Sequence, residues 1–431
     1  MRPSNLFSFS FLSSLTLACS LHSSGDPPST SNSRRFTPNP STRTAIHGIH
    51  IFNGKTFTTP QTICLDNGLI TSLESCPDAP VQINGTGKFL LPGLFDSHVH
   101  LSDVHSLEDF TSYGCTTAMH MNCQNLTQCD ILTSQEGHGL ASVKRAGRSS
   151  VGINSSHAKH EPMRPKDEFI YPNTSGKAFA EWQFGNGSDF HKITAEVNGP
   201  TLGQQIDMVK TAHGEFGKQT MTHAADVLAY QQAIASRTDG IQHVPDDGLL
   251  SDAMIRRIKA QNQFVTPTLN IYEFGFRDPL LQKYFSIQPT SNQSIDHAET
   301  NAKALYKAGV PLIVGTDSIG KLTMNGSSVE VPLGLSVHFE MQNLVNIVGM
   351  SPAEAISAAT RDAAEWHRVP DRGAIEVGKR ADLLMLGSNP LVNITNTLDI
   401  EKVWALGVEV SRVTKRDGDE MGNPACTAGR V

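Results

Sequence analysis

Strand-like and helical runs alternate along the middle of the chain, and this alternation constrains the fold more than any other feature. Short apolar runs of strand length recur, and helical stretches such as 201–216 fall between most of them. Such alternation is typical of βα units in a parallel sheet, and eight units predict an α/β fold of the (β/α)8 TIM-barrel type. A late helix is marked by an N-cap at Ser351, a proline at Pro352 and a capping-box residue at Glu354. The expected strands are 89–95, 116–121, 149–154, 190–194, 219–223, 240–244, 264–269 and 311–317.

Two groups of short strands flank this central region. After residue 45, strand-like runs are broken by the turn dipeptides Asn53-Gly54 and Asn67-Gly68. Similar runs follow residue 373, so we expect the two groups to combine into one small β-sandwich. The predicted divisions are a signal peptide at 1–20, a disordered leader at 21–44, the sandwich at 45–88 and 369–412, the barrel at 89–368, and a C-terminal tail at 413–431.

The N-terminus predicts secretion. Arg2 precedes an apolar run from Leu6 to Leu17, and small residues follow it, as in a secretory signal peptide. The run is too short and too rich in serine to form a stable membrane span, so no membrane association is expected. N-glycosylation sequons agree with a eukaryotic secretory route. They begin at Asn84, Asn125, Asn154, Asn173, Asn186, Asn292, Asn325 and Asn393.

Cysteine content predicts disulfide bonds, and the net charge bears on nucleic-acid binding. Signal removal would leave cysteines for up to three disulfide bonds, and Cys123–Cys129 is the pair we expect. The formal net charge of −7, without a basic cluster, argues against nucleic-acid binding. The other candidates for pairing are Cys64, Cys76, Cys115 and Cys426.

Metal-ligand side chains lie at the ends of the expected strands. His98 and His100 follow the first strand one residue apart, so in an extended chain they point to the same side, where two imidazoles can bind one Zn²⁺. In a barrel, the carboxyl ends of the strands build the active site. The remaining candidates at strand ends are Lys192, His223, His243 and Asp317.

The sequence around these positions resembles the amidohydrolase superfamily of metal-dependent hydrolases. The matching segments are Leu91-Pro92-Gly93-Leu94-Phe95-Asp96-Ser97-His98-Val99-His100, Thr222-His223-Ala224, Gln242-His243-Val244, Gly315-Thr316-Asp317-Ser318 and Gly378-Lys379-Arg380-Ala381-Asp382-Leu383-Leu384. The segment Asp189-Phe190-His191-Lys192-Ile193 resembles the lysine motif of the branch that contains ochratoxinase-like amidases, Xaa-Arg dipeptidases and related prolidases.

This resemblance implies a ligand set and a mechanism. Lys192 would be carboxylated and would bridge two metal ions, which we expect to be Zn²⁺. One ion would be held by His98, His100 and Asp317, and the other by His223 and His243. A metal-activated hydroxide would attack the amide, and Asp317 would act as general acid and base.

Four further residues are candidate substrate contacts, with ordinary structural roles as the alternative. His157 and His160 lie near the end of the third expected strand, as His120 does near the second. Glu196 stands where the related amidases and prolidases have a Ser-Gly-Gly-rich sequence. It could contact a metal or the substrate, or be a surface residue. The remaining two candidates are Tyr272 and His338.

Three functions are in competition. The first is a secreted amidase or dipeptidase acting on a small-molecule amide, with assembly into a homo-oligomer left open. The second is a mononuclear deaminase or cyclic-amide hydrolase, for which Asp226 stands three residues after His223. The third is a non-catalytic secreted binding protein. Lys192 and the complete ligand set favour the first.

Overall fold

The computed structural model describes residues 32–288 and 292–411. The predicted signal peptide, the first part of the leader, the C-terminal tail and Cys426 lie outside the described residues. Within them, no helix combines the length and the apolar character needed to cross a membrane.

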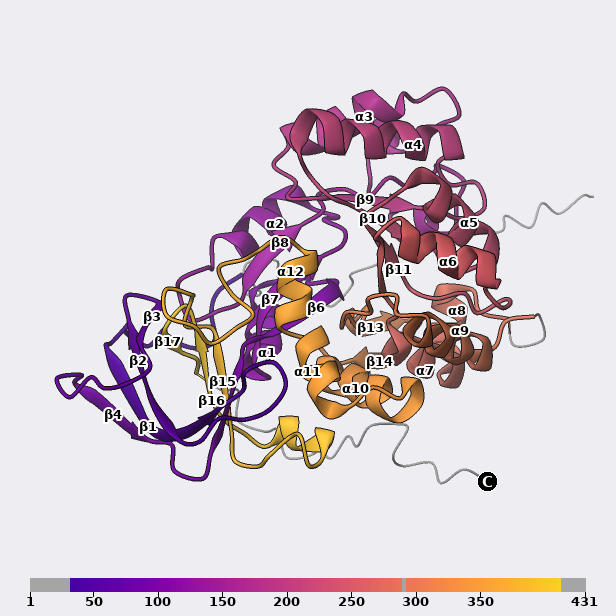
Figure 1. Ribbon diagram of the computed structural model, residues 1–431. Helices are drawn as coiled ribbons and strands as arrows, with labels where there is room; N and C mark the ends of the chain where they lie inside the picture. Colours follow the sequence, from indigo (N-terminus) through magenta and orange to yellow (C-terminus); the bar gives the residue numbers. More distant parts are fainter. Residues whose placement is uncertain (1–31, 289–291, 412–431) are drawn as a thin grey trace, which may run out of the picture.

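The central region is an α/β unit of TIM-barrel-like arrangement, in which parallel strands form two sheets (Figure 1). The three-stranded sheet has the order β6-β7-β8 and the four-stranded sheet the order β12-β11-β10-β9. Isolated parallel bridges add segments to both: Ser150 pairs with Ile193, Leu312 with Val265, and Ser318 with Val99. The strands are β6 (Leu94–Val99), β7 (Cys115–His120), β8 (Ser142–Arg145), β9 (His191–Thr194), β10 (Thr220–His223), β11 (Gly240–Gln242) and β12 (Phe264–Thr266).

Helices follow most of these strands, and apolar side chains between helices and strands form the largest hydrophobic core. Helix α5 spans Val227–Ser236 and covers β10, while the expected late helix is α11 (Pro352–Ala358), with its capping box at Ser351 and Glu354 formed. The other helices are α1 (Val104–Ser112), α2 (Leu126–Thr133), α3 (Gly176–Gly185), α4 (Leu202–Thr211), α6 (Asp252–Ala260), α7 (Leu269–Arg277), α8 (Pro279–Phe285), α9 (Ile295–Lys307), α10 (Leu335–Asn343) and α12 (Arg361–Trp366). The short helices are η1 (His157–His160), η2 (Lys166–Glu168), η3 (Ala212–Phe216), η4 (Leu344–Val348) and η5 (Ile394–Leu398), and β13 (Gly320–Met324) pairs with β14 (Ser327–Val331) in a hairpin.

Three strand predictions need correction. The expected strand 89–95 is divided at Gly93 between β5 (Phe89–Pro92) and β6, which belong to different sheets. A Cβ at Gly93 would lie 2.1 Å from Thr116 Oγ1, so the chain passes β7 too closely for a side chain. The apolar run continues across the change of sheet because both halves are buried. The third strand is β8 and not 149–154, a segment that pairs only through isolated bridges. The eighth expected strand, 311–317, is likewise not a regular strand, and Leu312 forms only an isolated bridge with Val265.

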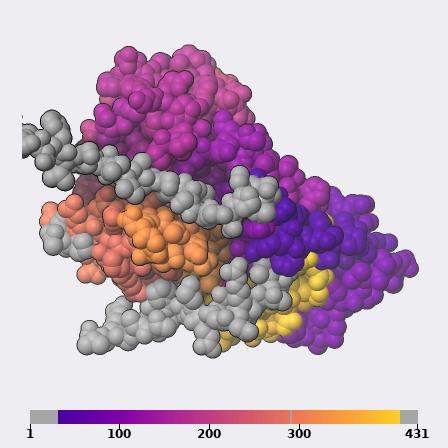
Figure 2. All heavy atoms as spheres, turned by 180° about the vertical axis from the view of Figure 1, so that it is seen from behind, coloured from indigo at the N-terminus to yellow at the C-terminus, as the bar shows by residue number. Residues whose placement is uncertain are grey.

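The N-terminal and C-terminal β segments meet in one eight-stranded sheet. Its order is β17-β16-β15-β5-β1-β2-β3, and β4 pairs with β1. Both views show the N-terminal strands beside the C-terminal ones, on one side of the molecule (Figures 1 and 2). The division of this sheet into two packed sandwich layers stays a prediction. The strands are β1 (Thr44–Ile51), β2 (Gln61–Asp66), β3 (Leu69–Ser72), β4 (Val81–Asn84), β15 (Leu383–Leu386), β16 (Ile400–Ala405) and β17 (Val408–Glu409).

Two disulfide bonds and an ion pair connect segments near the N-terminal half of the described chain. Disulfide bonds join Cys64 to Cys76 and, as expected, Cys123 to Cys129, whereas Cys115 is a buried free thiol. The end of the expected disordered leader is held in place, because Arg35 Nε lies 2.8 Å from the carboxylate of Glu108, a buried residue of α1. This contact concerns the last part of the leader, and disorder of the leader as a whole stays a prediction.

Candidate active site

The six predicted ligands lie at the carboxyl ends of parallel strands. His98 is on β6, Lys192 is on β9, and His223 ends β10, with His100, His243 and Asp317 directly after strands or in the 311–318 segment. His243 and Asp317 have positive φ angles of 73° and 55°, a strained conformation for residues with side chains. Backbone hydrogen bonds hold this strain, from His243 N to Thr266 O at 2.8 Å and from Asp317 N to His98 O at 2.7 Å.

The side chains of these residues converge. Asp317 Oδ1 lies 3.3 Å from His98 Nε2 and 3.0 Å from His100 Nε2. Lys192 Nζ lies 3.3 Å from His98 Nε2, and the rings of His223 and His243 are 4.5 Å apart between centroids. Ligand atoms of His98, His243 and Asp317 all lie within 4.8 Å of one another, close enough to hold one ion.

Burial sets the charge state of this group. Desolvation holds the pKa values of His98, His223 and His243 well below the ordinary histidine value, so these imidazoles are neutral and keep a lone pair for a metal. Desolvation also lowers the pKa of Lys192 to about 7. Neutral imidazoles next to a carboxylate are the donor set that zinc prefers, so the residues fit a metal ion.

Neighbouring side chains orient the ligands. His98 Nδ1 lies 2.9 Å from Gln242 Oε1, and His243 Nδ1 lies 2.8 Å from Thr268 Oγ1. Each contact occupies Nδ1 and leaves Nε2 to face the centre, which is the usual way in which a protein fixes a metal-binding histidine. Neither Gln242 nor Thr268 could be recognised from the sequence as the partner of a ligand, because each contact joins residues that are distant along the chain.

A buried carboxylate supports the backbone of the centre. Asp96 accepts hydrogen bonds from His98 N and Thr316 N, each at 3.0 Å, and from Thr316 Oγ1 at 2.6 Å. It thereby ties β6 to the segment that carries Asp317. Complete burial raises the pKa of Asp96 to about 7.

Two of the predicted substrate contacts lie beside the centre. The ring of His157 is 4.4 Å from that of His223, and the ring of His160 is 4.2 Å from that of Tyr284. Tyr284 belongs to α8, and no sequence pattern marks it as a neighbour of His160, because tertiary packing brings the two residues together. His120 lies next to His100, with 6.2 Å between ring centroids.

The other two predicted contacts have structural hydrogen bonds. The hydroxyl of Tyr272 donates to Val244 O at 2.5 Å and so supports the backbone next to His243. His338 is a correction, because both of its ring nitrogens are occupied in the core. Its Nδ1 lies 2.9 Å from Thr397 Oγ1, and its Nε2 lies 2.8 Å from Tyr113 O. A buried histidine with two satisfied nitrogens has none left for a substrate.

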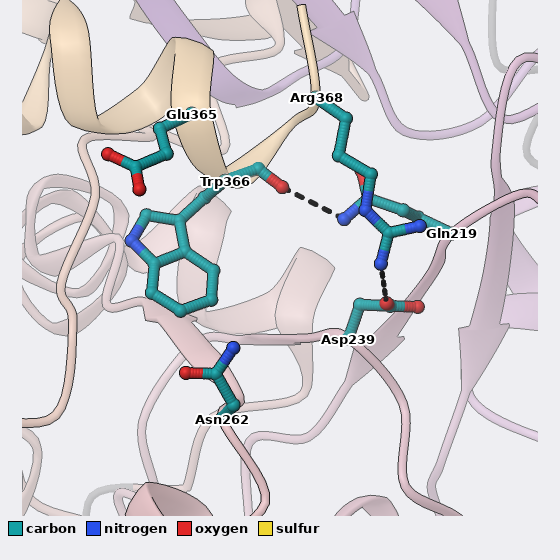
Figure 3. A pocket seen from close by; sticks show the side chains of 6 residues that line it. All are labelled: Gln219, Asp239, Asn262, Glu365, Trp366 and Arg368. Carbon is teal, nitrogen blue, oxygen red and sulfur yellow. Dashed lines mark hydrogen bonds and ion pairs between the residues drawn. The ribbon is translucent and has the colours of Figure 1, made fainter.

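A hollow of about 300 Å³ lies at the ends of the strands opposite to those that carry the proposed ligands (Figure 3). Gln219, Asp239 and Asn262 come shortly before β10, β11 and β12, and Trp366 and Arg368 lie opposite them. Arg368 binds Asp239 at 2.9 Å, and Gln219 donates to Trp366 O at 2.8 Å. This hollow contains none of the predicted site residues and lies at the amino ends of the strands, where barrel enzymes do not place their chemistry.

Comparisons with known proteins show what the chain is similar to. Residues 89–410 match the model of the Amidohydrolase family. An adenine deaminase of Listeria innocua is 21% identical over 381 residues, which cover 81% of this chain and 55% of that enzyme. The chain therefore spans about half the length of the adenine deaminases that it matches. An imidazolonepropionase of a Geobacillus species is 25% identical over 354 residues, covering 70% of this chain and 76% of that protein.

Solved structures show the same fold at low sequence identity. A Xaa-Pro dipeptidase with bound methionine aligns with a TM-score of 0.69 at 21% identity, covering 85% of this chain and 99% of that one. The ochratoxinase of A. niger aligns with a TM-score of 0.69 at 17% identity, covering 90% of this chain and all of that one. At such identities the likeness establishes the fold only.

Proposed function

Because the chain belongs to the amidohydrolase family, we propose that it is a metal-dependent hydrolase that cleaves the amide bond of a small, peptide-like substrate. The observation that carries this proposal is the convergence of His98, Lys192 and Asp317, whose polar atoms lie 3.3 Å apart or less from one residue to the next. Neither a structural core nor a simple binding protein requires this costly burial of amine, imidazoles and carboxylate.

Two Zn²⁺ ions are the cofactors we propose. His98, His100 and Asp317 would hold one, His223 and His243 the other, and Lys192 would bridge them as a carbamate. An ammonium has no lone pair and a neutral amine has only one, whereas a carbamate offers two anionic oxygens that can bind two cations, and we therefore propose the carboxylated form of Lys192. Bound there, the metal ions would acidify water and polarise the scissile carbonyl.

Asp317 is the residue to which we assign the proton transfers. As water oxygen forms its bond to the amide carbon, Asp317 accepts a proton from that water. When the carbon–nitrogen bond breaks, Asp317 returns the proton to the leaving amine. Its Oδ1 lies 3.0 Å from His100 Nε2 and 3.3 Å from His98 Nε2, so this proton acceptor stands among the proposed metal ligands. His157, His160 and Tyr284 would contact the substrate from the loops above.

Deamination is the second candidate, and the named relatives among adenine deaminases favour it. Its acidic group would be Asp226, three residues after His223. Asp226, however, caps α5, and its side chain accepts a hydrogen bond from Ala229 N at 2.7 Å. A capping role accounts for this aspartate without catalysis, so amide hydrolysis remains our first proposal.

We also propose that the protein is secreted and N-glycosylated. The asparagines of all eight sequons are exposed, as an oligosaccharide acceptor must be. For the architecture, we propose that the two parallel sheets close into one barrel through segments 149–152 and 311–318. The domain divisions given above are proposals of the same standing.

Metal content and amide hydrolysis of a Lys192→Ala variant test the proposed function. We expect two equivalents of zinc in the wild-type protein and turnover of dipeptides or N-acyl amino acids. In the variant, zinc content and hydrolysis should both fall, while the exposed control Lys210→Ala keeps both. One tightly bound metal with full activity in the variant would contradict the binuclear centre. Turnover of aminopurines or cyclic amides alone would favour the second candidate.

A further inference from the structure

A carboxylate–imidazole pair lies next to the proposed metal centre, and none of its members is a proposed ligand. His157 Nδ1 lies 2.9 Å from Glu196 Oε1, which also accepts a hydrogen bond from His157 N at 3.2 Å. Ser156 Oγ donates to the other carboxylate oxygen, Oε2. Since Nδ1 is occupied, Nε2 is the ring nitrogen of His157 that can face a substrate.

We propose that Glu196 is a positioning and specificity-determining residue, which fixes His157 over His223 and makes this part of the substrate site select a neutral group over an anionic one. The proposal deepens the proposed amide hydrolysis and rests on it. It concerns the part of the substrate that lies against His157.

The backbone brings this pair together from two separate loops. His157 and His160 lie three residues apart on the 3₁₀ helix η1, and residues at this spacing eclipse one another, so both rings lie on the same side. The segment after β9 packs directly against the start of this loop. A Cβ on Gly152 would lie 1.9 Å from Asn198 O, and Asn198 itself adopts a positive φ of 61°. Any side chain at position 152 would separate Glu196 from His157.

The net charge of the Glu196–His157 pair determines which substrate group it favours. A protonated histidine by itself would attract the carboxylate of a substrate. With the carboxylate of Glu196 on its Nδ1, the pair carries a net charge of zero when His157 is protonated and of minus one when it is not. The pair never presents a net positive charge, so a neutral carbonyl or carboxamide is accepted here and a carboxylate is disfavoured.

A matched pair of ligands tests the proposal. The probes are N-methylsulfonyl-leucine and N-methylsulfonyl-leucinamide, in which a sulfonamide replaces the amide that the enzyme would cleave. They differ in charge at one end only, and their binding to the metal-loaded protein is measured by calorimetry. In Glu196→Gln, we expect the affinity ratio to shift about tenfold toward the anionic probe, because the negative charge is lost while the side-chain shape is kept. Glu196→Asp, which keeps the charge, should retain the wild-type preference. Glu215→Gln, the same change at an exposed residue on η3, should leave the ratio unchanged.

The outcomes separate this proposal from the proposed function. A shifted ratio in Glu196→Gln with an unchanged melting temperature and zinc content supports the role of Glu196, whether or not the wild-type protein hydrolyses amides. An unchanged ratio overturns that role, and so does the absence of measurable binding of both probes to both proteins. Loss of zinc from Glu196→Gln would likewise overturn it, since Glu196 would then support the metal centre. Absence of hydrolysis with any amide would refute the proposed function alone.

Discussion

At the scale of single residues, the centre depends on side chains that contact Nδ1 of the ligand histidines. Thr268 holds His243 through its hydroxyl, and both residues have left-handed backbone conformations. Valine has the same branched shape as threonine and bears the same backbone strain, so replacing one by the other removes only the hydroxyl. Comparison of the two proteins therefore isolates the hydrogen bond to Nδ1.

We expect Thr268→Val to weaken zinc binding about 10- to 100-fold, because the ring of His243 loses its fixed orientation. Chelator competition measures this affinity. Thr323→Val, at an exposed position of β13, is the control and should bind zinc as the wild-type protein does. Equal zinc affinity in Thr268→Val would show that the backbone alone orients His243.

The sequence predicted the ligands well and their supports poorly, for a physical reason. A ligand at a strand end is marked by its own neighbours in sequence, as His98 is by the run Leu91–Phe95. A support such as Gln242 lies 144 residues from the histidine that it orients, and no local pattern marks it. His338 shows the opposite failure, because its residue type indicated function while its two hydrogen bonds serve the core.

At the scale of elements, helix ends are where sequence and structure agree most closely. The capping box of α11 was predictable because Ser351 and Glu354 are three residues apart and contact each other. Helix α7 begins differently. Its N-cap, Thr268, makes no side-chain capping bond, and the first amides donate to Glu340 of α10 instead, from Leu269 N at 3.0 Å and from Asn270 N at 2.7 Å. A cap from 71 residues away cannot be found by local spacing.

Glu340 should make the stability of the protein depend on pH. Burial raises the pKa of its carboxyl group from the ordinary glutamate value of 4.5 to about 8 in the folded protein. The folded state therefore holds this proton more tightly than the unfolded state does. Stability from this group is complete below pH 4.5 and is lost as the pH rises toward 8, by at most about 1.4 kcal/mol per pH unit.

Denaturant unfolding at pH 5, 6.5 and 8 measures this dependence. The free energy of unfolding of Glu340→Gln should vary less over this range than that of the wild-type protein, because glutamine does not titrate. Glu330→Gln, at an exposed position of β14, should follow the wild-type curve. Identical curves for Glu340→Gln and wild type would mean that Glu340 keeps its ordinary pKa, held there by the two amides of α7.

At the scale of the whole molecule, the eight-stranded sheet connects the chain ends to the centre. Strand β5 pairs with β1 from the N-terminal segment and with β15 from the C-terminal one. After Gly93 the same chain continues as β6, which carries His98. That the two terminal segments would meet was predictable from their similar patterns. The single hydrogen-bonded order of the sheet was not, because strand pairing between segments some 300 residues apart leaves no periodic signal in either.

Trp404 tests whether this sheet acts as a separate support for the centre. The side chain is 1% exposed and lies in the cluster that joins Leu90 of β5 to Leu383 of β15. Removing so large a buried ring leaves a cavity, so Trp404→Ala should lower the free energy of unfolding by about 3–5 kcal/mol. Trp182→Ala, at a partly buried position on α3, should lower the free energy of unfolding by less.

Because no proposed ligand belongs to the cluster that contains Trp404, zinc bound per folded molecule of Trp404→Ala should stay at the wild-type level well below the lowered melting temperature. A loss of zinc from the folded variant would show instead that the sheet sets the position of β6, and that the two parts of the fold form one cooperative unit.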